Sequence, residues 1–536
     1  MQKKIFSLII IPILLSSCTG VASLKFVPYT NYVEEQDLMI NEENTYSKRS
    51  KSVNAINTRN GNVSSLQGLL SMTNSDLLKK SIFPKGEKKL LVVPIAFADS
   101  NVPSLGEKHT YIENAFFGET KRTTYDSVAG YYNKSSYGQL KITGAVAPWY
   151  RNDMIKAKDW RSALNTTDHT KASTLLVAQA VDWLKKQNLI DNIDQYDTDS
   201  DGYIDAVYAI YDYPLDENGD TNSLFWAYVY YTHQGQYELN NEAPYVNAYA
   251  WSSADKIKAR GNLSNTNYLI HEAGHLLGLT DYYNIYASGN NSLFHYGPTG
   301  CFDMMDYNIG DHSSFSKYLL QWTSPYVINE NLETTTVNLR PFQSSGDYLL
   351  IPSSKYRANP SPFSEYLLVD YFTPEGLNKF NGSYSYTDKD GRTGVYTYPQ
   401  HHGVRIYHIN ATLGYFQKGR SGSPLIATVD DPEAETKIGN KIVGVDYAYS
   451  NSISDEKALN GYPVLIHLLE GSGDNTFIDG IPADNETLFR TGDDFGIVTF
   501  KDFTFSDGEQ INFKLKVKGL SSKEATLEIS NISTSD

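Results

Sequence analysis

The chain has 536 residues, of which 40% are hydrophobic and 20% are charged, and its formal net charge is −16. A chain of this length is too long to fold around one ordinary hydrophobic core, so we expect two or three domains. The acidic balance argues against nucleic acid as a partner, because phosphate binding requires clustered cations.

The first residues have the pattern of a bacterial lipoprotein signal. Lys3 and Lys4 precede an apolar run at 5–15, and Cys18 follows small residues. The run is shorter than the roughly 20 residues that span a bilayer, so it predicts a signal peptide over 1–18. Lipidation of the Cys18 thiol would add two acyl chains and anchor the protein durably to the outer face of a membrane. The alternative is an ordinary signal peptide with a chance cysteine, which would leave the protein secreted.

Residues 19–88 are polar and lack periodicity, which indicates a flexible tether or a propeptide. Order begins with the apolar run at 89–99, which is typical of a buried strand. Helices are predicted at 123–137, stopped by Gly138, and at 171–188, and further strands at 139–147, 204–212 and 245–251. The strand at 245–251 is a candidate edge strand of a cleft. This mixture predicts an α+β domain over 89–325 with a mixed, twisted sheet.

The stretch "YDTDSDGYID" gathers four carboxylates around a turn-forming Gly202. They are Asp197, Asp199, Asp201 and Asp205. Alternate carboxylates around a glycine are how calcium loops assemble oxygen ligands. A full helix-loop-helix site carries Glu at the twelfth position, where this chain has Tyr208. We therefore predict a structural Ca²⁺ site in a loop that resembles a calcium loop but is not a standard helix-loop-helix site. The alternative is an acidic, solvated turn.

The stretch "HEAGHLLGLTD" predicts a metal-binding helix. His271 and His275 are four residues apart, so both imidazoles share one helical face and can bind one zinc ion. Glu272 is placed to accept a proton from a metal-bound water. Gly278 permits a sharp exit from the helix, after which Asp281 can return as the third ligand. The alternative is an amphipathic helix that carries two surface histidines.

The identity of the third ligand has alternatives. In a second class of zinc peptidases that ligand is a glutamate on a later helix. No Glu occurs between Glu272 and Glu330, so Asp281 is the preferred ligand. His295, Asp303 and His312 are rivals.

The stretch "GCFDMMDYN" at 300–308 resembles the methionine turn of the metzincin clan, which forms a hydrophobic floor beneath the metal. Met305 fits the position of that methionine. Tyr307 matches a position from which a tyrosine can hydrogen-bond the tetrahedral intermediate, although it is equally well explained by packing. Cys301 is expected to be a buried thiol near the site.

After Pro325 the helical signal nearly vanishes. Short apolar runs alternate with Gly, Pro, Asn and Asp, which predicts antiparallel, sandwich-like β structure. The predicted strands are 365–372, 403–409, 441–449, 463–469 and 511–519. We expect a β-rich domain over 326–470 and a small C-terminal β domain over 471–536.

These motifs together resemble the immune inhibitor A family of secreted bacterial zinc metallopeptidases. The resemblance rests on "VVPIAFAD", "SVAGYYNKSSYGQLKITG", "YDTDSDGYIDAVYAIY", "HEAGHLLGLTDYY", "FDMMDYN" and "SSFSKYLLQWTSP". It implies a metzincin-like catalytic domain over 89–325 with appended β domains. It also implies that His271, His275 and Asp281 bind zinc and that Glu272 is the general base.

The sequence therefore predicts a monomeric, cell-surface zinc endopeptidase that acts on proteins or peptides. The alternative is a non-catalytic adhesin or binding lipoprotein whose metal only holds the fold. Structural zinc sites are normally closed by four protein ligands, and a glutamate beside the first ligand has no structural purpose. Both features favour the enzyme.

Overall fold

The computed structural model describes residues 56–58, 61–63, 84–216, 223–231, 242–259, 262–285, 297–328, 334–379, 399–417, 424–496, 499–500 and 502–531. The predicted signal peptide, Cys18 and most of the predicted tether lie outside these residues. The described chain is mixed α and β, and it divides into two compact units after Thr280. The second unit includes a short hairpin of β1 (Ile56–Thr58) and β2 (Gly61–Val63).

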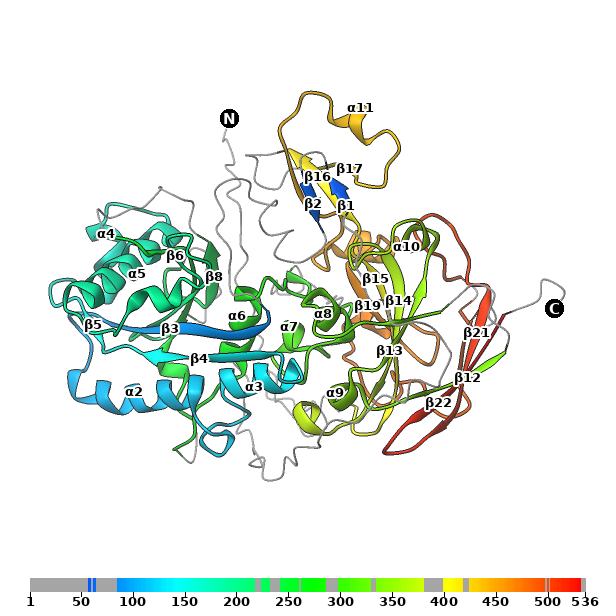
Figure 1. Cartoon of the computed structure of the whole chain (residues 1–536), viewed down its shortest axis with the longest axis horizontal. Coiled ribbons are helices and arrows are strands. Elements are labelled where there is room, and N and C mark those ends of the chain that lie inside the picture. Colours follow the sequence, from blue (N-terminus) through cyan, green and yellow to red (C-terminus); the bar gives the residue numbers. More distant parts are fainter. Residues whose placement is uncertain are drawn as a thin grey trace. The chain divides into compact units, whose positions relative to one another are not determined.

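The first unit is built on one mixed sheet (Figure 1). Its strand order is β4 (Leu140–Val146), β3 (Gly86–Ala96), β7 (Val207–Tyr211), β10 (Ala248–Ser253) and β8 (Tyr228–Tyr231), and β5 (Tyr150–Arg151) also pairs with β3. All these pairings are parallel except that of β8 with β10. A separate pair of short strands consists of β6 (Tyr203–Ile204) and β9 (Tyr245–Val246).

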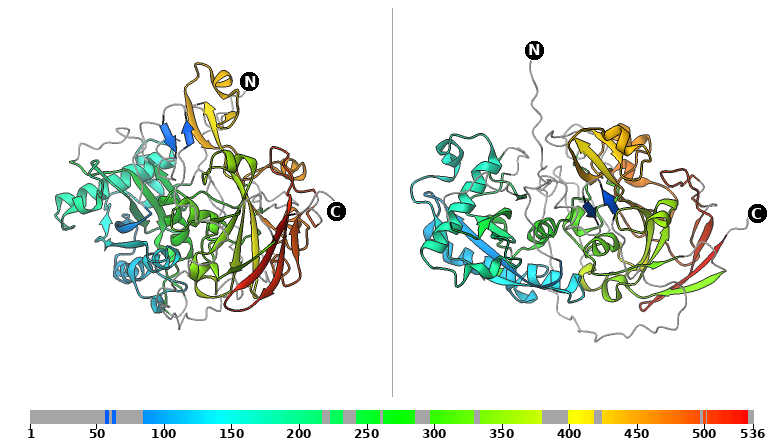
Figure 2. Two further views of the ribbon diagram at one scale, coloured as in Figure 1. Left: turned by 45° about the vertical axis from the view of Figure 1, so that its right-hand side comes forward. Right: turned by 45° about the horizontal axis from the view of Figure 1, so that its top comes forward.

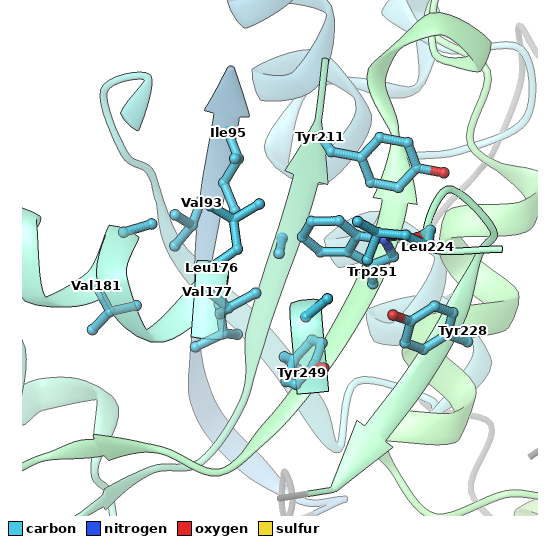
Figure 3. Close-up of a cluster of buried hydrophobic side chains, with 14 of the residues drawn as sticks. Val93, Ile95, Leu176, Val177, Val181, Tyr211, Leu224, Tyr228, Tyr249 and Trp251 are labelled. Carbon is cyan, nitrogen blue, oxygen red and sulfur yellow. Dashed lines mark hydrogen bonds between the residues drawn. The ribbon is translucent and has the colours of Figure 1, made fainter. Parts of the chain in front are cut away.

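The internal strands of this sheet are buried on both sides because helices cover both of its faces. On one face, Val93 and Ile95 pack against α5 (His169–Lys186) in a core that Figure 3 shows. On the other face, Tyr208 contacts Phe116 of α2 (Val102–Phe117) with ring centroids 4.6 Å apart. The Tyr208 hydroxyl also lies 3.4 Å from the Leu269 carbonyl of α6 (Asn267–Leu276). Helix α6, which carries the two histidines, therefore lies on the face opposite α5.

The two predicted helices of this unit both form, and one of them is shorter than predicted. The Asp168 side chain accepts hydrogen bonds from the backbone N–H groups of Thr170 and Lys171, and so caps α5. The predicted helix at 123–137 is shorter, since α3 (Val128–Ser135) begins after Ser127. Gly138 adopts φ +76°, which few residues other than glycine tolerate, so it ends this segment as predicted.

The prediction that 245–251 forms an edge strand is wrong. Strand β10 lies between β7 and β8, so it is internal. All six of its residues are buried, and burial without alternation is typical of a strand covered on both faces. Among the described strands of this sheet, β8 occupies the edge next to β10.

The second unit contains two larger sheets (Figure 2). Buried side chains from both sheets belong to one core. The first has the order β11 (Tyr326–Val327), β13 (Tyr348–Pro352), β14 (Glu365–Phe372), β15 (Gly403–Asn410) and β19 (Ile466–Leu469). The second has the order β12 (Thr335–Leu339), β22 (Ala525–Asn531), β21 (Phe513–Leu520) and β20 (Asp494–Gly496). All these pairings are antiparallel except that of β11 with β13. This arrangement agrees with the predicted sandwich-like β structure.

Strand pairing crosses the boundary predicted near residue 470. Strand β12, from the expected 326–470 domain, is antiparallel to β22, from the expected 471–536 domain. Side chains of both segments, such as Leu367 and Leu515, also belong to the shared core. These strands therefore form one folded body.

The other regular elements of the described chain are short. A third small sheet consists of β17 (Leu425–Thr428), β16 (Leu413–Gln417) and β18 (Val443–Tyr447). The short helices are α4 (Trp160–Ala163), α7 (Met304–Tyr307), α8 (Ser314–Leu319), α9 (Phe342–Ser345), α10 (Ser354–Ala358), α11 (Ala434–Ile438) and α12 (Asp455–Leu459). Within the part of the chain that the structure describes, no helix is both long and apolar enough to cross a membrane.

Candidate metal centre

Helix α6 ends in a tight turn that reverses the chain. The N–H of Gly278 bonds to the His275 carbonyl at 2.8 Å, and the N–H of Leu279 bonds to the Gly274 carbonyl at 3.1 Å. This pair of bonds is the Schellman motif, which requires a left-handed residue after the helix. Gly278 fills that position with φ +95°. The sharp exit predicted at Gly278 is therefore present.

The turn brings the third predicted ligand back to the histidines. One side-chain nitrogen of each of His271 and His275 and one carboxylate oxygen of Asp281 all lie within 4.8 Å of one another. Donors on a single zinc ion lie about 2.0–2.2 Å from it, hence no more than about 4 Å apart. Small side-chain adjustments therefore suffice for these three groups to bind one ion. Two imidazoles and a carboxylate also suit zinc chemically.

The ring of His275 is held in an orientation suited to binding a metal. Its Nδ1 lies 2.8 Å from the Leu279 carbonyl oxygen. A carbonyl oxygen only accepts hydrogen bonds, so Nδ1 carries the hydrogen and Nε2 keeps its lone pair. The backbone carbonyl of His275 accepts a hydrogen bond of 2.6 Å from the Tyr231 hydroxyl of β8. The helix and the edge strand of the sheet are thus tied together at this residue.

Glu272 lies in a protected environment beside the first histidine, with only 2% of its surface exposed. Burial raises the pKa of Tyr208 well above its ordinary value, and the negative charge of Glu272 acts in the same direction. The carboxylate is therefore within electrostatic reach of the Tyr208 hydroxyl beneath the helix. The neighbouring turn of α6 is fixed by the Tyr132 hydroxyl, which donates to the Ile270 carbonyl at 2.7 Å.

The predicted methionine turn contacts the segment that carries Asp281. Met305 is fully buried in α7, and its carbonyl accepts a hydrogen bond of 2.9 Å from the N–H of Tyr282. Asp303 caps α7, since its carboxylate accepts from the N–H of Met305 at 2.7 Å. Tyr307, the last residue of α7, is partly exposed. Its role toward a reaction intermediate stays a prediction.

The rival third ligands have different surroundings. Asp303 accepts backbone hydrogen bonds from Met305 and from Ser313, and burial raises its pKa to about 6. Among the described residues, neither Asp303 nor His312 belongs to the group formed by the two helix histidines. His295 lies outside the described residues. Asp281 therefore remains the best-placed third ligand.

Cys301 differs from the expected buried thiol. It is only partly buried, and its backbone lies in the left-handed region with φ +60°. It belongs to the turn that precedes α7, where the adjacent Gly300 also has a positive φ of +61°. A left-handed backbone at a cysteine has no local signal from which it could be predicted.

The acidic loop forms a second candidate metal site. Carboxylate oxygens of Asp197, Asp199 and Asp205 lie within 4.8 Å of one another, and Asp201 is not part of this group. The carboxylate of Asp201 instead accepts a hydrogen bond of 3.0 Å from the N–H of Tyr203. Gly202 has φ +87°, as a turn-forming glycine requires. Burial raises the pKa of Asp205 to about 6, against the opposing effect of hydrogen bonds from the N–H and hydroxyl of Thr198, and a nearby cation would favour the charged form.

No family model matches the chain, and no curated protein sequence is significantly similar to it. The resemblance to the immune inhibitor A family therefore rests on the quoted sequence stretches, and membership of that family stays a prediction. The geometry around α6 carries the functional argument independently of that resemblance.

Proposed function

We propose that the protein is a zinc-dependent endopeptidase with a metzincin-like catalytic domain. The observation that carries the proposal is the convergence of His271, His275 and Asp281 donor atoms within 4.8 Å. Glu272, the residue that follows His271, is buried. Three protein ligands leave one position of a tetrahedral zinc ion for water, which is the arrangement of catalytic sites. When bound, the zinc ion would lower the pKa of that water and polarise the substrate carbonyl.

The chain's own residues supply the proton transfers. Glu272 accepts a proton from the attacking water as its oxygen forms a bond to the peptide carbonyl carbon. The same carboxylate then gives this proton to the departing amine nitrogen as the C–N bond breaks. Tyr307 is the candidate hydrogen-bond donor to the oxyanion of the intermediate. The Nδ1 hydrogen bond of His275 to Leu279 keeps one ligand oriented throughout.

An extended substrate has a suitable place beside β8. Peptides commonly bind by adding a strand to an exposed sheet edge, and β8 pairs only with β10 among the described strands. This assignment replaces the edge first expected at 245–251. The predicted anchor at Cys18 would hold such an enzyme at the extracellular face of a bacterial membrane, with protein or peptide substrates as its partners.

A binding protein with a purely structural metal is the competing function. Structural zinc sites usually have four protein ligands. Within the described residues, the group around the helix histidines contains three such side chains. The buried glutamate next to His271 also has no use in a closed structural site. We therefore favour catalysis.

The decisive experiment removes the proposed base while keeping the metal ligands. Glu272→Gln preserves the size of the side chain but cannot accept the proton, so cleavage of a protein substrate should fall about 10²–10⁴-fold. Zinc content, measured by elemental analysis, should stay at the wild-type level. The matched control is Glu113→Gln on the exposed surface of α2, which should change neither quantity.

Two results would contradict the proposal. One is wild-type cleavage by the Glu272→Gln protein. The other is a wild-type protein that binds no zinc after purification in its presence.

A further inference from the structure

The segment that carries the third ligand has no regular secondary structure of its own. Residues 281–284 belong to no helix or strand. Asp281 therefore lacks the helical support that orients His271 and His275. Its position depends on whatever holds the four residues that follow it, 282–285, which we call the ligand segment.

A distant stretch of the chain holds the ligand segment through hydrogen bonds. The side-chain amide of Asn451 donates to the Tyr282 carbonyl at 2.8 Å, across 169 residues of sequence. The Ser452 hydroxyl accepts from the N–H of Ile285 at 3.3 Å. The side-chain amide of Asn284 donates to the Ile453 carbonyl at 2.9 Å. The Ser452 hydroxyl also donates to the Tyr283 carbonyl at 3.5 Å, so residues 451–453 make four hydrogen bonds with the ligand segment.

Asn451 is the most constrained member of this stretch. Only 1% of its surface is exposed, and its Oδ1 accepts a hydrogen bond of 3.0 Å from the N–H of Ile466. The amide therefore uses its oxygen toward β19 and its nitrogen toward Tyr282, which fixes its orientation. Tyr282 is fully buried, and its N–H bonds to the Met305 carbonyl at 2.9 Å. Both the N–H and the carbonyl of Tyr282, the residue after Asp281, are therefore hydrogen-bonded.

We infer that Asn451 is a positioning residue for Asp281, and that zinc affinity depends on its side-chain amide. The inference rests on the proposed zinc site. Removal of a group that hydrogen-bonds and orients a metal ligand typically lowers metal affinity about 10- to 100-fold. Here the orienting group bonds to the carbonyl of the residue that follows the ligand, so it restrains the course of the backbone next to Asp281.

The test measures zinc affinity by competition with a chromophoric chelator, on the full chain and without a substrate. Asn451→Asp keeps the acceptor for Ile466 but replaces the donor with a carboxylate that repels the Tyr282 carbonyl. Zinc affinity should fall about 10- to 100-fold. The matched control is Asn410→Asp, because Asn410 is equally buried and its carbonyl oxygen accepts from the Thr412 hydroxyl. The control should lower the melting temperature of the zinc-free protein but leave zinc affinity within twofold of wild type.

A double-mutant cycle separates positioning from general destabilisation. In an Asp281→Ala background, Asn451→Asp should have no further effect on zinc affinity, because the residue that it positions is gone. If Asn451→Asp does not fold, Ser452→Ala removes two longer hydrogen bonds to the same ligand segment and should lower zinc affinity at least threefold.

The inference is overturned if the folded Asn451 variant, or the Ser452 variant in its place, binds zinc as wild type does. It is also overturned if the Asn451 effect persists undiminished in the Asp281→Ala background. A wild-type protein that binds no zinc would instead remove the proposed function itself.

Discussion

Gly278 shows how strongly one residue controls the candidate metal centre. The chain must turn between His275 and Asp281, and the turn uses a positive φ of 95° at this glycine. A side chain at that angle collides with the neighbouring carbonyl, which costs roughly 1–2 kcal/mol for an L-residue in the left-handed region. Any relief of this strain changes the direction in which the chain leaves α6.

Gly278→Ala should therefore lower both stability and zinc affinity. We expect a loss of roughly 1–2 kcal/mol in the free energy of unfolding, measured with a chemical denaturant, together with weaker zinc binding in the chelator assay. Gly138→Ala is the matched control, since Gly138 also has a positive φ of 76° and has open space where a Cβ would lie. Similar destabilisation with unchanged zinc affinity is expected there. Equal zinc affinities in the two variants would contradict the role given to Gly278.

Residues of the centre could be predicted where they are neighbours in sequence. His271, Glu272, His275, Gly278 and Asp281 lie within eleven residues, so helical periodicity and one turn suffice to place them together. The supports of the centre were not predictable in this way. Tyr231 and Asn451 reach it only through the fold, and neither carries a local signal that separates it from any other polar residue.

At the scale of elements, the acidic loop between α5 and β7 offers a second metal site. Its three converging carboxylates repel one another, and a divalent cation relieves that repulsion. The loop leads directly into β6 and β7, and β7 is an internal strand of the sheet. A bound cation there would stabilise the first unit without taking part in the chemistry at α6.

Adding Ca²⁺ at about 100 times its dissociation constant should raise the melting temperature by about 5 °C. Differential scanning calorimetry after chelation and calcium-only addition checks this. Asp199→Asn should abolish the increase, because Asp199 belongs to the converging group. Asp201→Asn is the control and should keep the increase, since Asp201 lies outside that group and uses its carboxylate oxygen toward Tyr203. A melt that calcium does not change would exclude the site.

Strands and helices with strong periodicity were predictable, and their places in the sheets were less so. Helix α5 and strands β3, β14 and β15 form at the predicted residues. The edge position was assigned to β10 because it precedes the histidine helix, but order along the chain does not fix order in a sheet. The short, tyrosine-rich β8 gave little signal, and it takes the edge.

At the scale of the whole molecule, the C-terminal strands are part of a larger core. Strands β20, β21 and β22 bury Phe495, Leu515 and Leu527 against the same core that contains Leu367 and Val369 of β14. A domain boundary near residue 470 was suggested by the spacing of turn residues. Turn spacing cannot reveal which strands pair across 186 residues, as Leu339 and Ala525 do.

A chain shortened to end at residue 470 should therefore fail to fold its β-rich part. Loss of three strands exposes the apolar faces of β12 and β14, so we expect aggregation and a weakened near-ultraviolet circular dichroism signal. A chain that ends at residue 531 retains β22 and serves as the control, with an unchanged spectrum. A soluble, monomeric product ending at 470 with a native spectrum would show that the C-terminal strands form a separate domain.

If the protein is the proposed peptidase, the bond between the Tyr231 hydroxyl and the His275 carbonyl has a consequence for the position at which a substrate is cleaved. A peptide that paired with β8 could shift its register only by two residues at a time, because backbone hydrogen bonding along a strand recurs every two residues. Since β8 is hydrogen-bonded to the helix that carries the proposed ligands, each such register would lie at a fixed distance from the proposed zinc site. The register of the peptide on β8 would then determine which of its peptide bonds reaches the zinc site.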